Sequence, residues 1–184
     1  DEDNIEISGG NWVSANLYKY RVLTEYSEGR RPGDFGDQFI YNMETGKNTR
    51  IWNYTGTYLN KALRSGKKIT GRLDVLSYLP DDEKNILVAV SPFKRDGGVR
   101  PTVYKLELST GDLTKVMNGP ARAATMLTNE TADTIVAFAP TEKFTTNFFY
   151  RRASDKFWTA IDIDFPGNFS GLNVSDDGKL LFGL

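Results

Sequence analysis

The sequence of 184 residues contains no histidine and no cysteine. Without an imidazole that titrates near neutral pH, the Ser-His-Asp and Cys-His mechanisms lack their general base. Without cysteine there are no disulfides and no thiolate ligands for zinc. The sequence therefore predicts no catalytic residue, no metal ligand and no cofactor-binding residue in this chain.

Long apolar runs and an excess of one charge are also missing. No stretch approaches the roughly 18 consecutive apolar residues of a membrane helix, so no membrane span is expected. The acidic start Asp1–Asp3 lacks the features of a signal peptide. The 23 basic and 24 acidic residues are interspersed and give a net charge of −1, so nucleic acid is not an expected partner. We expect a soluble protein, whether periplasmic or cytoplasmic.

The apolar residues that are present follow the pattern of β-structure. Hydrophobic residues make up 39% of the chain, enough for a packed core. In Val103–Met117, the side chains of Tyr104, Leu106 and Leu108 alternate with charged residues, which predicts a half-buried strand. Thr110–Gly111 then predicts a tight turn, because glycine adopts positive φ easily. The stretch is predicted to be a β-hairpin.

The same hairpin pattern occurs twice more, at Phe39–Trp52 and Phe148–Ile161. When Gly46 is aligned with Gly111, Met43 corresponds to Leu108 and Ile51 to Val116. Similar elements precede the hairpins: strands are predicted at Leu17–Leu23, Leu73–Leu79, Ile86–Val90, Thr125–Leu127 and Ile135–Phe138. Ser27–Gly36 is predicted to be a loop, and Tyr58–Arg64 a short helical turn.

The repeating unit predicts an all-β fold, a fragment of a β-propeller. Matching strands recur about 45 to 50 residues apart, which is a spacing typical of four-stranded propeller blades. We expect a single partial propeller over residues 1–184 with about three and a half antiparallel blades. The predicted blades are residues 5–54, 73–117, 122–163 and, incomplete, 170–184, with 55–72 as an inserted loop.

Several of these segments, in this order, resemble the amino-terminal β-propeller of prolyl-oligopeptidase-family serine peptidases, especially dipeptidyl and acylaminoacyl peptidase-like members. The segments are Tyr78–Glu83, Ile86–Val90, Val103–Leu106, Thr110–Gly111, Val116–Pro120 and Val174–Lys179. The resemblance runs over nearly the whole chain. Ser-Asp-Asp-Gly-Lys and Thr-Gly turns also occur in TolB-type propellers.

The resemblance implies a gating domain that admits short peptides and excludes folded proteins. In that family an α/β-hydrolase domain follows the propeller and carries the catalytic serine, aspartate and histidine. This sequence contains neither a Gly-x-Ser-x-Gly motif nor a histidine, so no catalytic residue is carried over. The implied partners are peptide substrates and a hydrolase domain of the same parent chain, and the parent is expected to be a serine peptidase.

Two arginine pairs are the candidate ligand contacts. Arg30, Arg31, Arg151 and Arg152 are expected to anchor a carboxylate such as a peptide terminus if they face a ligand, because guanidinium groups bind carboxylates bidentately. The alternative is that they are solvated loop and edge residues. Three carboxylate pairs are interpreted mainly as turn and edge residues: Asp81/Asp82, Asp162/Asp164 and Asp176/Asp177.

Two other functions remain open at the level of sequence. One is a TolB-type propeller that serves as a protein-interaction scaffold. The weaker one is a carbohydrate-active propeller that uses Asp162 or Asp164 as an acid or base. A partial ring also leaves blade edges without a neighbour, which predicts self-association through those edges.

Overall fold

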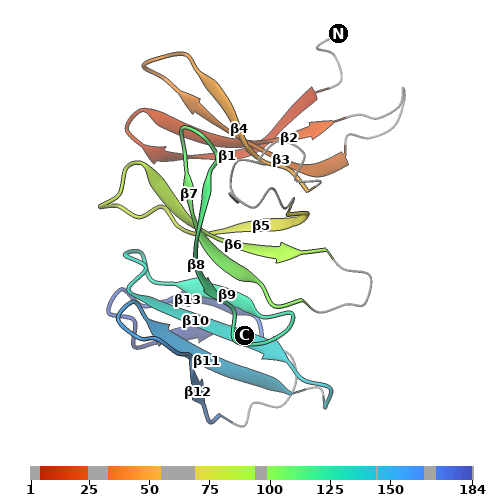
Figure 1. The fold of residues 1–184 in the computed structure, drawn as a ribbon, viewed down its shortest axis with the longest axis vertical. Coiled ribbons are helices and arrows are strands. Elements are labelled where there is room, and N and C mark those ends of the chain that lie inside the picture. The colour runs from red at the N-terminus through yellow and green to blue at the C-terminus, as the bar shows by residue number, and fades with distance from the viewer. Residues whose placement is uncertain are drawn as a thin grey trace. The chain divides into compact units, whose positions relative to one another are not determined.

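The computed structural model describes residues 5–24, 33–54, 69–93, 99–143, 145–163 and 169–183. Within these ranges the regular structure consists of fourteen β-strands, which form three four-stranded sheets and one two-stranded sheet (Figure 1). The described residues include no helix long and apolar enough to cross a membrane. The chain divides into two compact units, residues 1–73 with 106–114 and residues 74–105 with 115–184. Arg30, Arg31 and the predicted helical turn at Tyr58–Arg64 lie outside the described residues.

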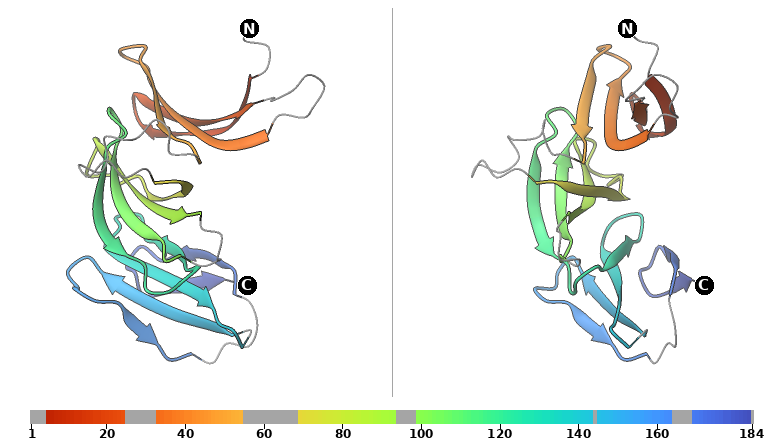
Figure 2. Two further views of the ribbon diagram at one scale, coloured as in Figure 1. Left: turned by 45° about the vertical axis from the view of Figure 1, so that its right-hand side comes forward. Right: turned by 90° about the vertical axis from the view of Figure 1, so that its right-hand side faces the viewer.

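The first sheet pairs its strands in chain order, and every pair is antiparallel. Figure 2 shows its strong curvature. The strand Leu17–Leu23 is confirmed, and the preceding strand, which no sequence pattern had indicated, pairs with it across a tight turn at Ala15–Asn16. The four strands are β1 (Ile5–Ser14), β2 (Leu17–Thr24), β3 (Gly33–Asn42) and β4 (Asn48–Trp52).

The predicted loop Ser27–Gly36 is wrong at its C-terminal end, because β3 already begins at Gly33. The pairing register of β2 and β3 shifts between Val22 and Leu23, where Asp37 gives way to Asp34 as the partner. Gly36 lies in this irregularity with φ of 73°. A glycine inside a strand commonly marks a β-bulge, and here the polar, glycine-rich composition of the bulge resembles that of a loop.

The second sheet contains the predicted hairpin Val103–Met117. Its strands are β5 (Gly71–Ser77), β6 (Asn85–Pro92), β7 (Thr102–Glu107) and β8 (Leu113–Asn118), again neighbours in chain order. As predicted, Tyr104, Leu106 and Leu108 are buried while Lys105 is exposed. Gly111 has φ of 75°, so the turn uses the positive φ for which the glycine was singled out.

The turns at Gly46 and Gly111 are built in the same way. The Gly46 amide donates to the Asn42 carbonyl at 2.9 Å, and the Gly111 amide donates to the Glu107 carbonyl at 2.8 Å. Gly46 also has positive φ, at 66°. The predicted equivalence of the two hairpin turns is therefore confirmed.

The third sheet has the strand order β12-β11-β10-β9, and a two-stranded sheet of β13 and β14 follows it in the chain. The pattern of three four-stranded sheets and a partial fourth is the one expected from the repeat. The strands are β9 (Thr125–Thr128), β10 (Thr134–Pro140), β11 (Thr146–Arg152), β12 (Thr159–Ile161), β13 (Gly171–Val174) and β14 (Leu181–Gly183).

The turns that join β9 to β10 and β13 to β14 repeat each other. The side-chain oxygen of Asn129 accepts a hydrogen bond from the Thr134 amide at 3.0 Å, and that of Ser175 accepts one from the Leu180 amide at 2.9 Å. Gly178 in the second turn has φ of 69°. The equivalent residue of the first turn, Ala132, has φ of 62° although it carries a Cβ. Small polar side chains thus cap both turns.

The core of the second unit is formed by strands of the second and third sheets. Ile135 and Ala137 of β10 are buried with residues of β6, β7 and β8 in one apolar cluster. Phe149 and Trp158 are partly buried and pack against this cluster. Its buried members are Leu87, Ala89, Val103, Met117, Ala124, Met126, Ile135, Ala137 and Ala139.

Candidate functional site

A groove in the second unit lies between β8 and the outer hairpin of the third sheet, with a cavity volume of about 590 Å³. This volume is within the range of about 300 to 1,000 Å³ that is typical of ligand clefts. One wall comes from β8 and the residues that follow it. The other comes from β11, β12 and the turn between them. The lining residues are Arg100, Lys115, Val116, Met117, Asn118, Gly119, Pro120, Phe149, Arg151, Lys156, Phe157, Trp158 and Ala160.

The apolar lining of the groove is continuous with the core. Met117 belongs to the core cluster, and Phe149 and Trp158 pack against it. The indole Nε1 of Trp158 donates to the carbonyl oxygen of Asn118 at 2.9 Å, which joins the two walls. Phe157, by contrast, is 81% exposed. An exposed aromatic side chain beside a firmly held apolar surface provides contact area for a ligand.

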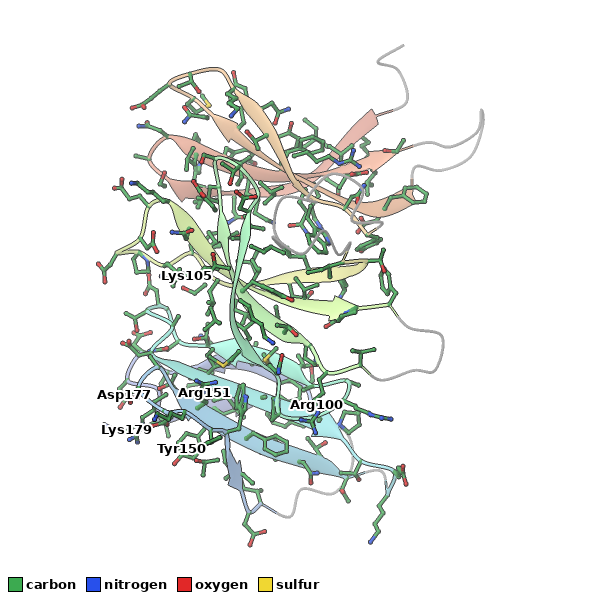
Figure 3. All side chains as sticks on the ribbon, in the orientation of Figure 1. Arg100, Lys105, Tyr150, Arg151, Asp177 and Lys179 are labelled. Atoms are coloured by element: carbon green, nitrogen blue, oxygen red, sulfur yellow. The ribbon has the colours of Figure 1, made fainter. Side chains whose placement is uncertain are left out.

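The charged lining of the groove is entirely basic. Among the residues that the structure describes, Arg100, Lys115, Arg151 and Lys156 line it, and no aspartate or glutamate does. Figure 3 labels Arg100 and Arg151. None of the four forms an ion pair within the part of the chain that the structure describes. Toward the described residues, the Arg151 side chain donates only from its Nε, to the Asp155 carbonyl at 2.9 Å. The guanidinium group of Arg151 is thereby oriented, and its Nη nitrogens stay available.

The nearby carboxylate of Asp155 does not line the groove. Its Oδ2 accepts a hydrogen bond from the backbone amide of Arg152 at 3.0 Å, so this side chain closes the turn after β11. Within the described ranges, the positive charge of the groove is thus not offset by an acidic side chain of its lining.

The predicted pair Arg151 and Arg152 is split by the strand. Arg151 lines the groove, whereas Arg152 lines two other hollows together with Gly178 and Lys179. Successive side chains of an extended strand point to opposite faces, so two adjacent arginines in β11 do not form one anchor. Arg30 and Arg31 lie outside the described residues, and a ligand role for any of the four stays a prediction.

One carboxylate from each of two predicted pairs, Asp82 and Asp177, fulfils the predicted turn role. Asp82 accepts hydrogen bonds from Asn85 and from the Nζ of Lys105, and these contacts, with Asn85 the larger cause, lower the pKa of the Asp82 carboxyl. Asp177 accepts hydrogen bonds from the Ser175 hydroxyl and the Lys179 amide. These bonds lower the pKa of Asp177 to about 2. Both carboxylates are committed to local structure.

The third pair gives no support to acid–base chemistry. Asp162 is exposed, and Asp164 lies outside the described residues. Among the residues that the structure describes, no three histidine, cysteine, aspartate or glutamate side chains are grouped so that they could hold a metal ion.

The sequence offered no local signal for Arg100, Lys115 and Lys156 as members of one site. They lie before β7, in β8 and after β11, and each is an exposed basic residue among many. Only the pairing of strands into successive sheets brings them to the same groove. The one local signal was the doubled arginine at Arg151–Arg152, which identified one of the four groove cations.

The comparisons with known proteins concern the fold. No protein-family model and no curated protein matches the sequence. A crystal structure of TolB from Acinetobacter baumannii is similar, with a TM-score of 0.53 and 17% sequence identity. The alignment covers 97% of this chain and 37% of the TolB chain. An oligogalacturonate lyase in complex with manganese aligns with 84% of this chain and 35% of its own, with a TM-score of 0.52 and 7% identity.

The fold is that of a partial β-propeller. Successive four-stranded antiparallel sheets in chain order, together with these structural neighbours, identify the architecture. The structure of Porphyromonas gingivalis dipeptidyl peptidase 4 is also similar, with a TM-score of 0.41 and 8% identity over 85% of this chain and 30% of its own. The chain spans about a third of the length of the TolB structure. The partial propeller is thus similar to a part of longer proteins.

Proposed function

We propose that this partial propeller is a non-catalytic segment that controls the access of short peptides to the active site of a serine peptidase. The proposal is supported by successive antiparallel sheets in chain order, whose sequence motifs resemble, in their order, those of a peptidase propeller. Proton transfer and nucleophilic attack would take place in an α/β-hydrolase domain of the parent chain.

A hydrolysis assay tests the non-catalytic part of this proposal. The chain has neither histidine nor cysteine, so it offers no imidazole base and no thiolate nucleophile. We expect no hydrolysis of short peptide or ester substrates above the buffer rate. Measurable turnover by the purified chain, retained after a second purification step and absent from a mock preparation, would overturn the proposal.

A TolB-type interaction scaffold is the second candidate. The observation in its favour is that the TolB structure aligns with 97% of this chain. The two candidates differ in what the parent chain contains. A Gly-x-Ser-x-Gly motif followed by a histidine in the parent sequence would favour the peptidase, and their absence would favour the scaffold.

A carbohydrate-active propeller is the weakest candidate. The lyase neighbour shares the fold at 7% identity. The test is an Asp162→Asn variant: unchanged cleavage of an oligogalacturonate by this variant, or no cleavage by either form, excludes a role for that carboxylate.

Self-association is part of the proposal for this chain. Among the residues that the structure describes, β14 pairs only with β13. Leu180, which precedes β14, is 59% exposed, and Phe182 within it is 51% exposed. Exposed apolar side chains at an unpaired sheet edge favour pairing with another chain. We expect a dimer in sedimentation equilibrium. A Phe182→Lys variant should be monomeric. If the unsubstituted 184-residue chain is monomeric at all concentrations, this part of the proposal is contradicted.

A further inference from the structure

The basic groove of the second unit supports an inference that goes beyond peptide access. We propose that this groove is a docking site for an acidic polypeptide segment that carries an aromatic side chain between its carboxylates. The proposal rests on the composition of the groove and does not depend on the identity of a catalytic partner.

Charge complementarity indicates an anionic occupant. In the part of the chain that the structure describes, the lining contains Arg100, Lys115, Arg151 and Lys156 and no acidic residue, and these four form no ion pair. The net charge of the whole chain is −1, so this concentration of positive charge is local. Unpaired guanidinium and ammonium groups along one groove attract carboxylates and orient them on approach.

The aromatic lining indicates that the occupant also carries an apolar side chain. Phe157 is 81% exposed at the groove, and Phe149 and Trp158 are partly buried against the core. Rigid aromatic groups offer large contact area at low conformational-entropy cost. An aromatic side chain flanked by carboxylates therefore matches both kinds of lining.

Single-stranded nucleic acid also combines negative charge with aromatic groups. The balanced charge of the chain, 23 basic against 24 acidic residues, favours a peptide, because nucleic-acid-binding domains commonly have an excess of basic residues. A short oligothymidylate is therefore included in the test as the competing ligand.

The binding test uses a fluorescein-labelled peptide Glu-Glu-Phe-Glu-Glu and measures fluorescence anisotropy with the purified protein. We expect saturable binding that weakens as NaCl rises from about 50 to about 300 mM, because salt screens exposed charges. The amide analogue Gln-Gln-Phe-Gln-Gln should bind at least about tenfold more weakly, since it lacks the charges that pair with the groove. Glu-Glu-Ala-Glu-Glu should also bind more weakly.

Two matched double variants locate the binding site. Lys115→Gln/Lys156→Gln removes two exposed lysines of the groove, and Lys84→Gln/Lys143→Gln removes two exposed lysines outside its lining. The first should weaken binding about three- to tenfold, and the second should leave it unchanged within about twofold. Phe157→Ala, which alters an exposed side chain, should weaken binding as well. Circular dichroism checks that each variant is folded.

Four results would overturn the proposal. They are equal losses in the two double variants, equal affinity for the glutamate and glutamine peptides, no binding at about 1 mM protein in low salt, and tighter binding of the oligothymidylate than of the acidic peptide.

Discussion

Trp158 donates its indole hydrogen to the carbonyl oxygen of Asn118, at 2.9 Å, and so connects the segment before β12 to the end of β8. The two residues are 40 positions apart in the chain. The bond joins residues of the two walls of the basic groove and orients an aromatic side chain that packs against the core. The shape of the groove therefore depends on a tertiary contact that a substitution of Trp158 can test.

Replacing Trp158 by phenylalanine tests this contact. Trp158→Phe keeps an aromatic ring but removes the donor, and we expect the free energy of unfolding to fall by roughly 0.5 to 1 kcal/mol. Trp12→Phe is the matched control because Trp12 is exposed. Urea denaturation followed by circular dichroism measures both. An equal or larger loss in Trp12→Phe would contradict the role of the Trp158 bond.

The repeated turns predict that Ala132→Gly and Gly178→Ala change the stability of the protein in opposite directions. Ala132 has φ of 62°, so Ala132→Gly should relieve strain and stabilise the protein by up to about 1 kcal/mol. Gly178 has φ of 69°, and a Cβ there would lie 2.4 Å from the Thr134 Oγ1, so Gly178→Ala should destabilise it. Thermal unfolding of both variants gives the comparison. Shifts of the same sign in both would refute the equivalence of the turns.

A buried lysine in the first sheet predicts a pH-dependent gain in stability. Lys19 in β2 is only 8% exposed, and burial, followed by the nearby charge of Arg21, lowers the pKa of its ammonium group below 10.5. The folded state then holds this proton less tightly than the unfolded chain. The charged Lys19 therefore lowers the free energy of unfolding most at neutral pH. This penalty disappears as the pH increases from the folded pKa toward 10.5.

The corresponding variant is Lys19→Met, which keeps an apolar stem of similar length. We expect it to raise the free energy of unfolding by roughly 0.5 to 1 kcal/mol at pH 7, because the charged amine no longer has to be desolvated. The gain should shrink toward pH 10.5. Lys84→Met, at an exposed position, should give no such gain. Urea denaturation midpoints of both variants at several pH values measure these changes. A gain in Lys19→Met that grows with pH would contradict the account.

The Ser175–Lys179 turn predicts a measurable pKa change. The hydrogen bond from the Ser175 hydroxyl is the largest cause of the low pKa of Asp177, about 2. Because this folded pKa lies below the unfolded value of 3.8, the contribution of Asp177 to stability is present above pH 3.8 and is lost as the pH falls through about 2. Ser175→Ala should raise the pKa of Asp177 toward 3.8 in a carboxyl carbon NMR titration.

The control for this titration is Lys179→Gln, which removes the exposed ammonium group that lies 3.1 Å from Asp177 (Figure 3). Its effect on the pKa of Asp177 should be smaller than that of Ser175→Ala, because an exposed ion pair is well screened by solvent. A larger effect of Lys179→Gln would mean that charge, rather than the turn, sets this pKa.

Local patterns predicted the strand Leu17–Leu23 and the hairpin Val103–Met117, because both depend on neighbouring residues. The alternation at Tyr104, Leu106 and Leu108 and the positive φ of Gly111 follow directly from side-chain type. The loop predicted at Ser27–Gly36 failed at its end, where the glycine-rich sequence forms a bulge within β3.

Burial at equivalent positions of the repeat was harder to predict. Met43 was matched with Leu108, yet it is 55% exposed while Leu108 is buried. Ile51 is fully buried, whereas its counterpart Val116 is 43% exposed. The hairpin turns repeat because the backbone requires them, but burial depends on what packs over each strand. For the same reason the sequence did not predict a groove whose cations come from three separate segments.

The most direct test of the proposed access function is carried out on the native polypeptide that contains this sequence, called the parent polypeptide below. An antibody raised against this chain is used to isolate the parent polypeptide, which is then treated with a fluorophosphonate, a reagent that modifies activated serines. We expect labelling of a serine in a Gly-x-Ser-x-Gly motif on the same polypeptide, and none within the 184 residues of this sequence. A parent polypeptide that remains unlabelled while a known serine peptidase in the same reaction is labelled would contradict the account.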